Sequence, residues 1–211
     1  FPFKVDISER NGLISLNKPF PVREIKPRFD WITCSEPEGH LDDLVDVLIQ
    51  LPGISKKSVF ASFSFKDMST LERLKNKGFQ NQWSIDPEED LEIKDKKCSI
   101  ETFQSKFNLK TAVKILGKYG LADIVIVRHV LEHSYNINNF VSSIKKLIKK
   151  NGYLVWELPD CKKSLKKLDY TMLWEEHTYY FTKFTLKHFL KKNNFEIVNF
   201  YSVPYSYENS L

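Results

Sequence analysis

The feature that most constrains the fold is a short, uninterrupted apolar run near the middle of the chain. Asp123 is followed by Ile-Val-Ile-Val, which ends at Val127. A run of β-branched residues of this length is typical of a strand buried on both faces of a parallel sheet, because helices cover both faces of such a sheet. The run therefore predicts an α/β fold with this strand at its centre.

Strand and helix patterns alternate on either side of this run. Strands are predicted at 58–63, 79–85, 98–101, 123–127, 153–158 and 195–201, and helices at 40–51, 69–77, 108–119, 138–150 and 184–192. Parallel strands joined by single helices are connected by right-handed crossovers, which place helices on both faces of the sheet. We therefore predict a doubly wound, mainly parallel, Rossmann-like sheet.

Local signals mark several ends of these elements. Ser69 and Glu72 have the spacing of a helix capping box, and Asn108 is a typical N-cap residue. Gly78 and Gly120 stand where glycines end helices, and Asn151-Gly152 is predicted to stop the helix that precedes it.

The first 38 residues differ from the rest of the chain in their proline content. Five prolines surround a predicted hairpin at Asn11-Gly12. We interpret residues 1–38 as an extended N-terminal lead-in and residues 39–211 as one α/β domain.

Composition excludes several classes of protein. Of the 211 residues, 42% are hydrophobic and 14% aromatic, which is enough for a globular core and argues against disorder. No run reaches the roughly 18 apolar residues of a membrane-spanning helix. Cys34, Cys98 and Cys161 form no C-x-x-C pair, which argues against a disulfide framework and a structural zinc site. We expect a cytoplasmic protein that binds no metal and does not associate with a membrane.

The net charge of +5 is concentrated in the second half of the chain, where lysines fall in doublets. One interpretation is a phosphate-binding face for nucleic acid or nucleotide-linked substrates. The favoured interpretation is a solvated face, because the lysines at 145–150 alternate with apolar residues as on an amphipathic helix. Nucleic acid is therefore the least favoured partner.

Ligands of an open parallel sheet bind beyond the carboxyl ends of its strands. The segment after the first strand, 62–69, has no glycine, although nucleotide-binding enzymes carry glycines there. Asp86 follows the second strand, in the usual place of a carboxylate that binds ribose hydroxyls. Asp-Pro also begins turns, so the pattern alone leaves both interpretations open.

Two later segments carry titratable residues. Arg128-His129-Val-Leu-Glu132-His133 follows the central strand, and its first histidine ends that strand instead of lying inside a helix, which argues against a zincin-type metal pair. Farther on, Glu175-Glu176-His177 stands in an aromatic run without a regular period. Such a segment either performs acid-base chemistry or is a structural loop.

Several segments together resemble class I S-adenosylmethionine-dependent methyltransferases, and among them the sugar C-methyltransferases of deoxysugar biosynthesis. The most specific are A-D-I-V-I-V-R-H-V-L-E-H, G-Y-L-V-W-E-L-P-D and E-E-H-T-Y-Y-F-T. The resemblance implies S-adenosyl-L-methionine as cofactor and a small-molecule or nucleotide-linked keto-sugar substrate, in surface-polysaccharide biosynthesis. The family's zinc-binding N-terminal domain and its C-terminal domain have no counterpart in this sequence, and we expect a further domain to be missing from it.

The resemblance also implies a role for each matching residue. The cofactor site would comprise Asp86 at the ribose, Ser62 and Ser64 in the loop after the first strand, Glu101 and Thr102 near the adenine, and Arg128 and His129 beside the methionine part. His177 would be the base that removes a proton from the sugar carbon, because imidazole is largely unprotonated at neutral pH. Glu176 and His133 would orient this base or hold sugar hydroxyls.

One departure from the family leaves two functions open. Family members carry E-x-G-x-x-x-G after the first strand, whereas this chain has Phe63-Ser-Phe-Lys-Asp67, which would put side chains where the cofactor must approach the backbone. The first hypothesis is a sugar methyltransferase. The alternative is a catalytically inactive, methyltransferase-like binding or scaffolding module with a degraded cofactor pocket. A third hypothesis, a nucleic-acid methyltransferase, is supported only by the lysine doublets and is favoured least.

Overall fold

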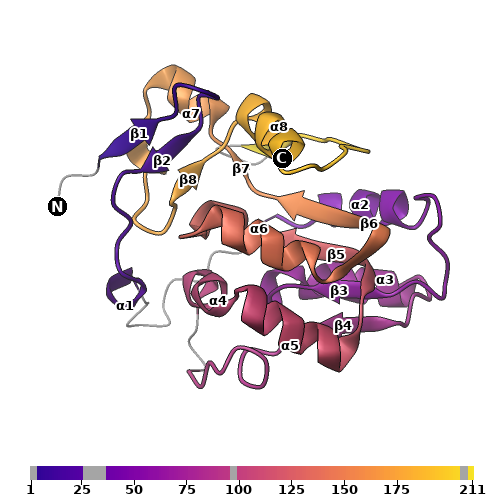
Figure 1. The fold of residues 1–211 in the computed structure, drawn as a ribbon. Helices are drawn as coiled ribbons and strands as arrows, with labels where there is room; N and C mark the ends of the chain where they lie inside the picture. Colours follow the sequence, from indigo (N-terminus) through magenta and orange to yellow (C-terminus); the bar gives the residue numbers. More distant parts are fainter. Residues whose placement is uncertain (1–3, 26–36, 96–98, 205–208) are drawn as a thin grey trace.

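The computed structural model describes residues 4–25, 37–95, 99–204 and 209–211 (Figure 1). Its central sheet has the strand order β4-β3-β5-β6, in which every pairing is parallel. The strands are β3 (Phe60–Ser62), β4 (Gln82–Ser84), β5 (Ala122–Arg128) and β6 (Ile148–Glu157). β5 lies between β3 and β6, and the side chains of Ile124 and Ile126 are fully buried. The predicted parallel sheet and its central strand are confirmed.

Helices cover both faces of this sheet (Figure 1). One layer consists of α2 (His40–Leu48) and α3 (Met68–Asn76), which pack on Ile124 and Ile126. The other consists of α4 (Ile100–Lys106), α5 (Leu109–Tyr119), α6 (Ile137–Lys145) and α8 (Lys183–Lys192). Val125 and Val127 face this second layer, because successive side chains of a strand point to opposite faces. The sheet is therefore doubly wound, as predicted.

The predicted signals at α5 and the predicted glycine stop of α3, Gly78 with φ 88°, are confirmed, whereas the predicted capping box of α3 is wrong. The side chain of Asn108 accepts hydrogen bonds from the N–H groups of Lys110 and Thr111, and Gly120 ends α5 with φ 78°. The capping box in this region belongs instead to the short turn η1 (Phe65–Asp67), which precedes α3, and it is formed by Ser64 and Asp67. The Ser69 hydroxyl is inside α3 and donates to Glu38 Oε1 at 2.6 Å.

The structure corrects two predicted elements before and after β5. The predicted strand at 98–101 falls partly outside the described residues, and its described part is the start of α4, whose Ile100, Phe103 and Phe107 are buried at helical spacing. The predicted helix at 138–150 ends at Lys145, and 148–150 already belong to β6. Gly152 lies inside β6, where an added Cβ would come within 2.8 Å of the Asp123 carbonyl oxygen.

The predicted last strand, 195–201, is also wrong. No strand pairing joins these residues to another described segment. Phe195 and Phe200 pack against the core, while Val198 is 56% exposed. The alternating pattern therefore does not bury one face, which a strand on this sheet would need.

The N-terminal segment forms the predicted hairpin, from β1 (Val5–Ile7) and β2 (Ile14–Leu16), and is followed by α1 (Val22–Ile25). β2 also pairs antiparallel with β8 (Tyr179–Tyr180). A third small sheet joins β7 (Pro159–Asp160), β10 (Asn209–Ser210) and β9 (Val203–Pro204). Between β7 and β8 lie α7 (Lys162–Lys167) and the turn η3 (Tyr170–Met172). The hairpin thus supports the segment that follows His177.

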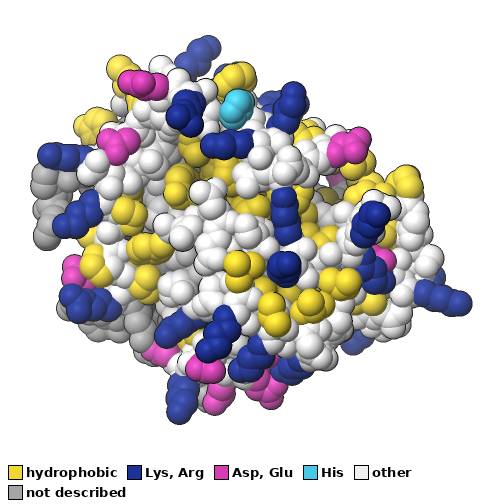
Figure 2. All heavy atoms as spheres, in the orientation of Figure 1, with side chains coloured by type: hydrophobic (Ala, Val, Ile, Leu, Met, Phe, Trp, Pro, Cys, Tyr) yellow, Lys and Arg dark blue, Asp and Glu magenta, His cyan; other side chains and the backbone are white. Residues whose placement is uncertain are grey.

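The surface agrees with the solvated-face interpretation of the lysines. Lysine and arginine side chains on the face in Figure 2 are interspersed with acidic, apolar and neutral polar residues. None of the helices in the described parts of the chain has the length and apolar character needed to cross a membrane. Cys161 is buried and forms no disulfide within the described part of the chain, whereas Cys34 and Cys98 lie outside the described residues.

Candidate active site

The carboxyl ends of the four parallel strands bring the predicted site segments to one edge of the sheet. Ser62, Ser84, Arg128 and Glu157 are the last residues of β3, β4, β5 and β6. The adjacent parallel pairings place these ends side by side. This is the edge at which open α/β sheets bind ligands.

A hollow of about 850 Å³ lies beyond the ends of β3 and β4. Its walls include Ser64, Phe65, Ser84, Asp86, Phe103 and Tyr119. The Tyr119 ring is stacked on Trp83, with 5.1 Å between the ring centroids. Aromatic faces beside serine hydroxyls and a carboxylate suit a ligand that joins a flat base to a hydroxylated sugar. A second hollow, of about 930 Å³, lies along α3 and shares Phe65, Met68 and Gln82 with the first. The linings of both hollows lack the residues that end β5 and β6.

Asp86 lines this hollow and also caps a turn. Its Oδ1 accepts hydrogen bonds from the N–H groups of Glu88 at 2.9 Å and Glu89 at 2.8 Å. The turn and ligand interpretations of Asp86 are thus compatible, since one carboxylate can serve both. The predicted Ser62 is buried, and its hydroxyl donates to Ser84 Oγ at 2.8 Å.

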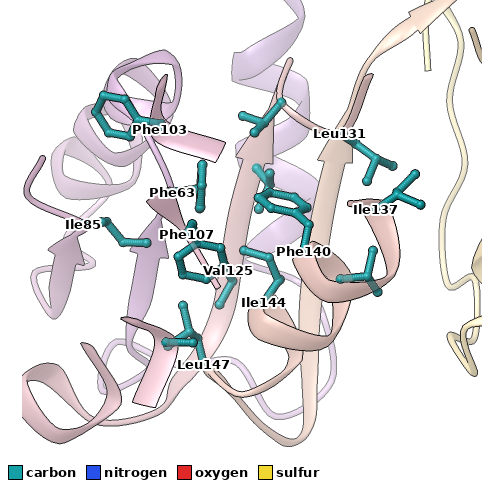
Figure 3. Close-up of a cluster of buried hydrophobic side chains, with 14 of the residues drawn as sticks. Phe63, Ile85, Phe103, Phe107, Val125, Leu131, Ile137, Phe140, Ile144 and Leu147 are labelled. Atoms are coloured by element: carbon teal, nitrogen blue, oxygen red, sulfur yellow. The ribbon is translucent and has the colours of Figure 1, made fainter. Parts of the chain in front are cut away.

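The expectation that Phe63 obstructs the cofactor region is wrong. Its side chain is fully buried and points into the core, where its ring meets those of Phe107 at 5.0 Å and Phe140 at 5.2 Å (Figure 3). Phe65 is different, because its side chain is 53% exposed and forms part of the wall of the hollow. The hollow therefore stays open although the loop has no glycine.

Asp67 holds the backbone of this loop. Its carboxylate accepts hydrogen bonds from the N–H groups of Phe63 at 3.0 Å, Ser64 at 2.9 Å and Arg128 at 2.8 Å. The side chain is fully buried, and this burial raises the pKa of Asp67 to about 7 in spite of the three donors. N–H groups that a glycine loop presents to a ligand are thus already satisfied within the chain.

Arg128 lies under the loop in a buried ionic network. Its Nε donates to Glu157 Oε2 at 2.5 Å, and its Nη1 donates to the Lys66 carbonyl at 2.5 Å. Its Nη2 is buried and has no hydrogen-bond partner among the described residues, although the residue is only 1% exposed. A buried guanidinium nitrogen without an acceptor is suited to a carboxylate or phosphate oxygen of a ligand.

Glu157 links this network to two histidines. Its Oε1 lies 3.3 Å from His129 Nε2 and 2.9 Å from His40 Nε2. Burial opposes ionisation of Glu157, but His129 and Arg128 outweigh it and hold its pKa well below the ordinary value. His129 has φ 50°, a left-handed conformation that is uncommon outside glycine. The end of β5 is therefore strained at a residue that joins two buried acids.

The second acid is Glu132, which lies beside His133 and His177. One side-chain ligand atom of each of these three residues lies within 4.8 Å of the others, and the two imidazole rings are 4.7 Å apart. His133 Nδ1 donates to the Glu176 carbonyl oxygen at 3.0 Å. The structure thus brings the predicted His133, Glu176 and His177 together, with Glu176 contributing its backbone. Two imidazoles and a carboxylate are also a possible donor set for a divalent cation, so the absence of a metal stays a prediction.

The predicted residues of the adenine region belong to α4. Thr102 Oγ1 and the neighbouring Ser99 Oγ are buried without a hydrogen-bond partner in the described part of the chain. Glu101 also lies in α4, and its side chain is outside the described part of the structure.

Sequence reasoning did not assign Asp67, Glu132, Glu157 or His40 to the site. Asp67 and Glu132 stand within the marked segments after strands, and Glu157 stands in the G-Y-L-V-W-E-L-P-D segment of the resemblance, so an acid at a strand end was the available signal. His40 had no such signal, because only the packing of α2 against the sheet brings it to Glu157.

Comparison with known proteins agrees with this architecture. Residues 66–199 match the family described as Methyltransferase domain, and the chain belongs to that family. The resemblance to class I S-adenosylmethionine-dependent methyltransferases is thereby confirmed. The C-methyltransferase NovU of Streptomyces niveus is 22% identical over 201 residues, which are 94% of this chain and 48% of that protein. The chain thus spans about half the length of this curated relative.

A solved structure of an O-methyltransferase family protein from Burkholderia thailandensis is also similar. Its TM-score is 0.44 at 12% sequence identity, and the match covers 82% of this chain and 56% of that chain.

Proposed function

We propose that this chain is the methyltransferase domain of a cytoplasmic enzyme that methylates a carbon atom of a nucleotide-linked keto-sugar or related saccharide, for surface-polysaccharide biosynthesis. The observation that carries the proposal is the meeting of His133, Glu132 and His177 at the sheet edge where ligands bind. The name of the C-methyltransferase relative supports carbon as the acceptor atom.

The residues beside the hollow fit S-adenosylmethionine. Asp86 and Ser64 line the hollow and would bind the ribose side of the cofactor, and Ser62 would support Ser84 in its wall from beneath. Thr102 of α4 would lie near the adenine, and its hydroxyl has no partner among the described residues. Nη2 of Arg128, which has no hydrogen-bond partner within the described ranges, would take the carboxylate of the methionine part. When bound, this cofactor supplies the electrophilic methyl group.

His129 completes the methionine side of the proposed site. Its ring lies between Glu157 and Glu132, at 3.3 Å and 3.6 Å, so it connects the proposed cofactor site to the histidine cluster.

The proposed chemistry of the chain begins with a proton transfer. A C–H bond next to the sugar carbonyl breaks, its electron pair forms the enolate, and the proton moves to a ring nitrogen of His177. This step needs an imidazole that is unprotonated near neutral pH and accessible to the substrate. His177 is half-buried, so substrate can reach it, while the carbonyl of Glu176 fixes the ring of His133 beside it.

The test compares His177→Asn with His188→Asn, a substitution at an exposed histidine of α8. Methyl transfer from labelled S-adenosylmethionine and solvent-deuterium exchange are measured on nucleotide-linked keto-sugars. We expect His177→Asn to reduce both by about 100 to 10,000-fold, with unchanged cofactor affinity and stability. Undiminished exchange in this variant would rule out His177 as the base.

One observation favours the alternative of an inactive binding or scaffolding module. The carboxylate of Asp67 already holds the loop N–H groups of Phe63 and Ser64. Calorimetric titration of the wild-type protein with S-adenosylmethionine separates the two functions. Binding supports the enzyme, and absence of binding at millimolar cofactor supports the module.

A further inference from the structure

Glu132 is a buried charge beside the proposed base. Its residue is 2% exposed, and neither carboxylate oxygen accepts a hydrogen bond from any described residue. The carboxylate forms an ion-pair contact with His129, whose Nδ1 lies 3.6 Å from Oε1, slightly beyond a hydrogen bond. A buried carboxylate without donors is costly unless positive charge lies nearby. The side chain therefore requires an electrostatic partner.

The backbone holds Glu132 close to His177. The N–H group and the hydroxyl of Thr178 both donate to the Glu132 carbonyl oxygen at 2.8 Å, and the hydroxyl also donates to the Ser134 carbonyl at 2.8 Å. These bonds tie the residue after His177 to the turn η2 (Leu131–His133). The separation between the carboxylate and the imidazole is thus set by a rigid, buried contact.

We propose that Glu132 is a positioning residue for His177, whose carboxylate stabilises the positive charge that forms on this imidazole when it takes the proton from the substrate carbon. The inference rests on the proposed function, because it requires His177 to be the base. To act as the base, the imidazole must be neutral before the proton arrives, and proton transfer then places a positive charge within 4.8 Å of a buried carboxylate oxygen. The attraction is strong there, since little water screens it.

The other buried acid near this site, Glu157, has charge partners of its own, which leaves Glu132 as the acid that faces His133 and His177. The acid on β6, Glu157, is neutralised by Arg128 and also contacts His129 and His40. Toward Glu132, η2 and the residues before it present His129 and His133, and the segment before β8 presents His177. Burial would raise the pKa of Glu132, but the contact with His129 and the attraction of His133 and His177 in their protonated forms outweigh it and lower that pKa. The carboxylate therefore keeps its negative charge when a proton reaches these imidazoles.

Besides Glu132 and His133, the titratable groups Tyr180 and Glu175 lie near the imidazole of His177. The ring of Tyr180 lies 6.2 Å from it, and burial raises the pKa of Tyr180, so this phenol stays neutral. The neighbouring Glu175 is exposed, and water screens its charge. Glu132 is thus the buried acid that the structure places against His177.

The experiment uses Glu132→Gln, which keeps the size of the side chain and removes its charge, with Glu175→Gln as the matched control. The titration of His177 is followed by NMR of its imidazole protons, assigned with His177→Asn, in the presence of a chelator. Without the carboxylate the imidazolium is less stable, so we expect the pKa of His177 to fall in Glu132→Gln and to change little in Glu175→Gln. The acidic limb of the kcat/KM profile should move to lower pH, with kcat reduced by about 10 to 100-fold and KM nearly unchanged.

A second variant guards against misfolding. Glu132→Asp keeps the charge, so we expect it to restore part of kcat and of the His177 titration. An unchanged His177 titration in folded Glu132→Gln, while the wild type is active, would overturn the inference and leave the proposed function intact. An inactive wild type would instead refute the proposed function. The wild-type titration is also measured without the chelator. If the chelator shifts the His177 titration of the wild type by as much as Glu132→Gln does, a metal ion is the charge partner, and the inference is overturned.

Discussion

Asp67→Asn tests whether the loop after β3 is held by one buried carboxylate. In the wild type, Oδ2 accepts the N–H groups of Phe63 and Ser64, and Oδ1 accepts that of Arg128. An amide has one oxygen, so it can keep the two bonds at the Oδ2 position only by turning its NH₂ group toward the Arg128 N–H. A buried donor left without its acceptor costs about 1–3 kcal/mol. For a chain of this length we expect the melting temperature to fall by about 2–4 °C for each kcal/mol.

The loss of stability caused by Asp67→Asn should become smaller as the pH rises. The pKa of Asp67 is raised from 3.8 to about 7 by burial, so the folded protein binds this proton more tightly than the unfolded chain. The stabilisation from protonation is complete below pH 3.8 and is lost as the pH rises toward 7. Asparagine does not titrate, so the difference in unfolding free energy between wild type and variant should narrow from pH 5 to pH 8.

Urea denaturation between pH 5 and pH 8 measures this difference, with Asp43→Asn, at an exposed acid of α2, as the control. Equal stability of wild type and Asp67→Asn at pH 5, or pH dependences that run parallel, would refute the reasoning.

Three further predictions concern the hollow and the histidine cluster. Asp86→Ala should weaken S-adenosylmethionine binding by about 100-fold, because a charge-assisted pair of bonds is worth roughly 3 kcal/mol. Asp86→Asn removes the charge but keeps an oxygen that can cap the turn, so it distinguishes the two roles of the side chain. Unchanged affinity of Asp86→Ala in calorimetry would refute the ribose contact. Phe63→Ala should destabilise the fold by about 3–5 kcal/mol in denaturation, whereas Phe65→Ala should mainly reduce cofactor affinity; the opposite pattern would contradict their placement. Chelator treatment and dialysis should leave methyl transfer unchanged, and activity that is lost with EDTA and restored by a divalent cation would show a metal at Glu132, His133 and His177.

Local sequence signals determined the frame of the fold. The run at 123–127 identified the central strand because a continuous β-branched segment is typical of a strand buried on both faces. Ile124 and Ile126 are buried on one face, and Val125 and Val127 are buried on the other. Asn108 and Gly120 identified the ends of α5 because capping depends on residues within one turn. The same local rules misplaced the boundary at 146–150. There Leu147 enters the core and Ile148 pairs with Ala122, and these contacts with distant residues turn the last predicted helical turn into a strand.

The sequence also located the segments of the site, since acids and histidines after strands stand out in one dimension. Which of them meet was decided by tertiary structure. Thr178 brings His177 to Glu132 through bonds to a carbonyl that lies far away in the chain, and the packing of α2 brings His40 to Glu157. Phe63 shows the same limit, because no local pattern states whether a side chain at a strand end points into the hollow or into the core. Periodicity reports on neighbours along one element, whereas charge, burial and reactivity at a site depend on atoms contributed by several elements.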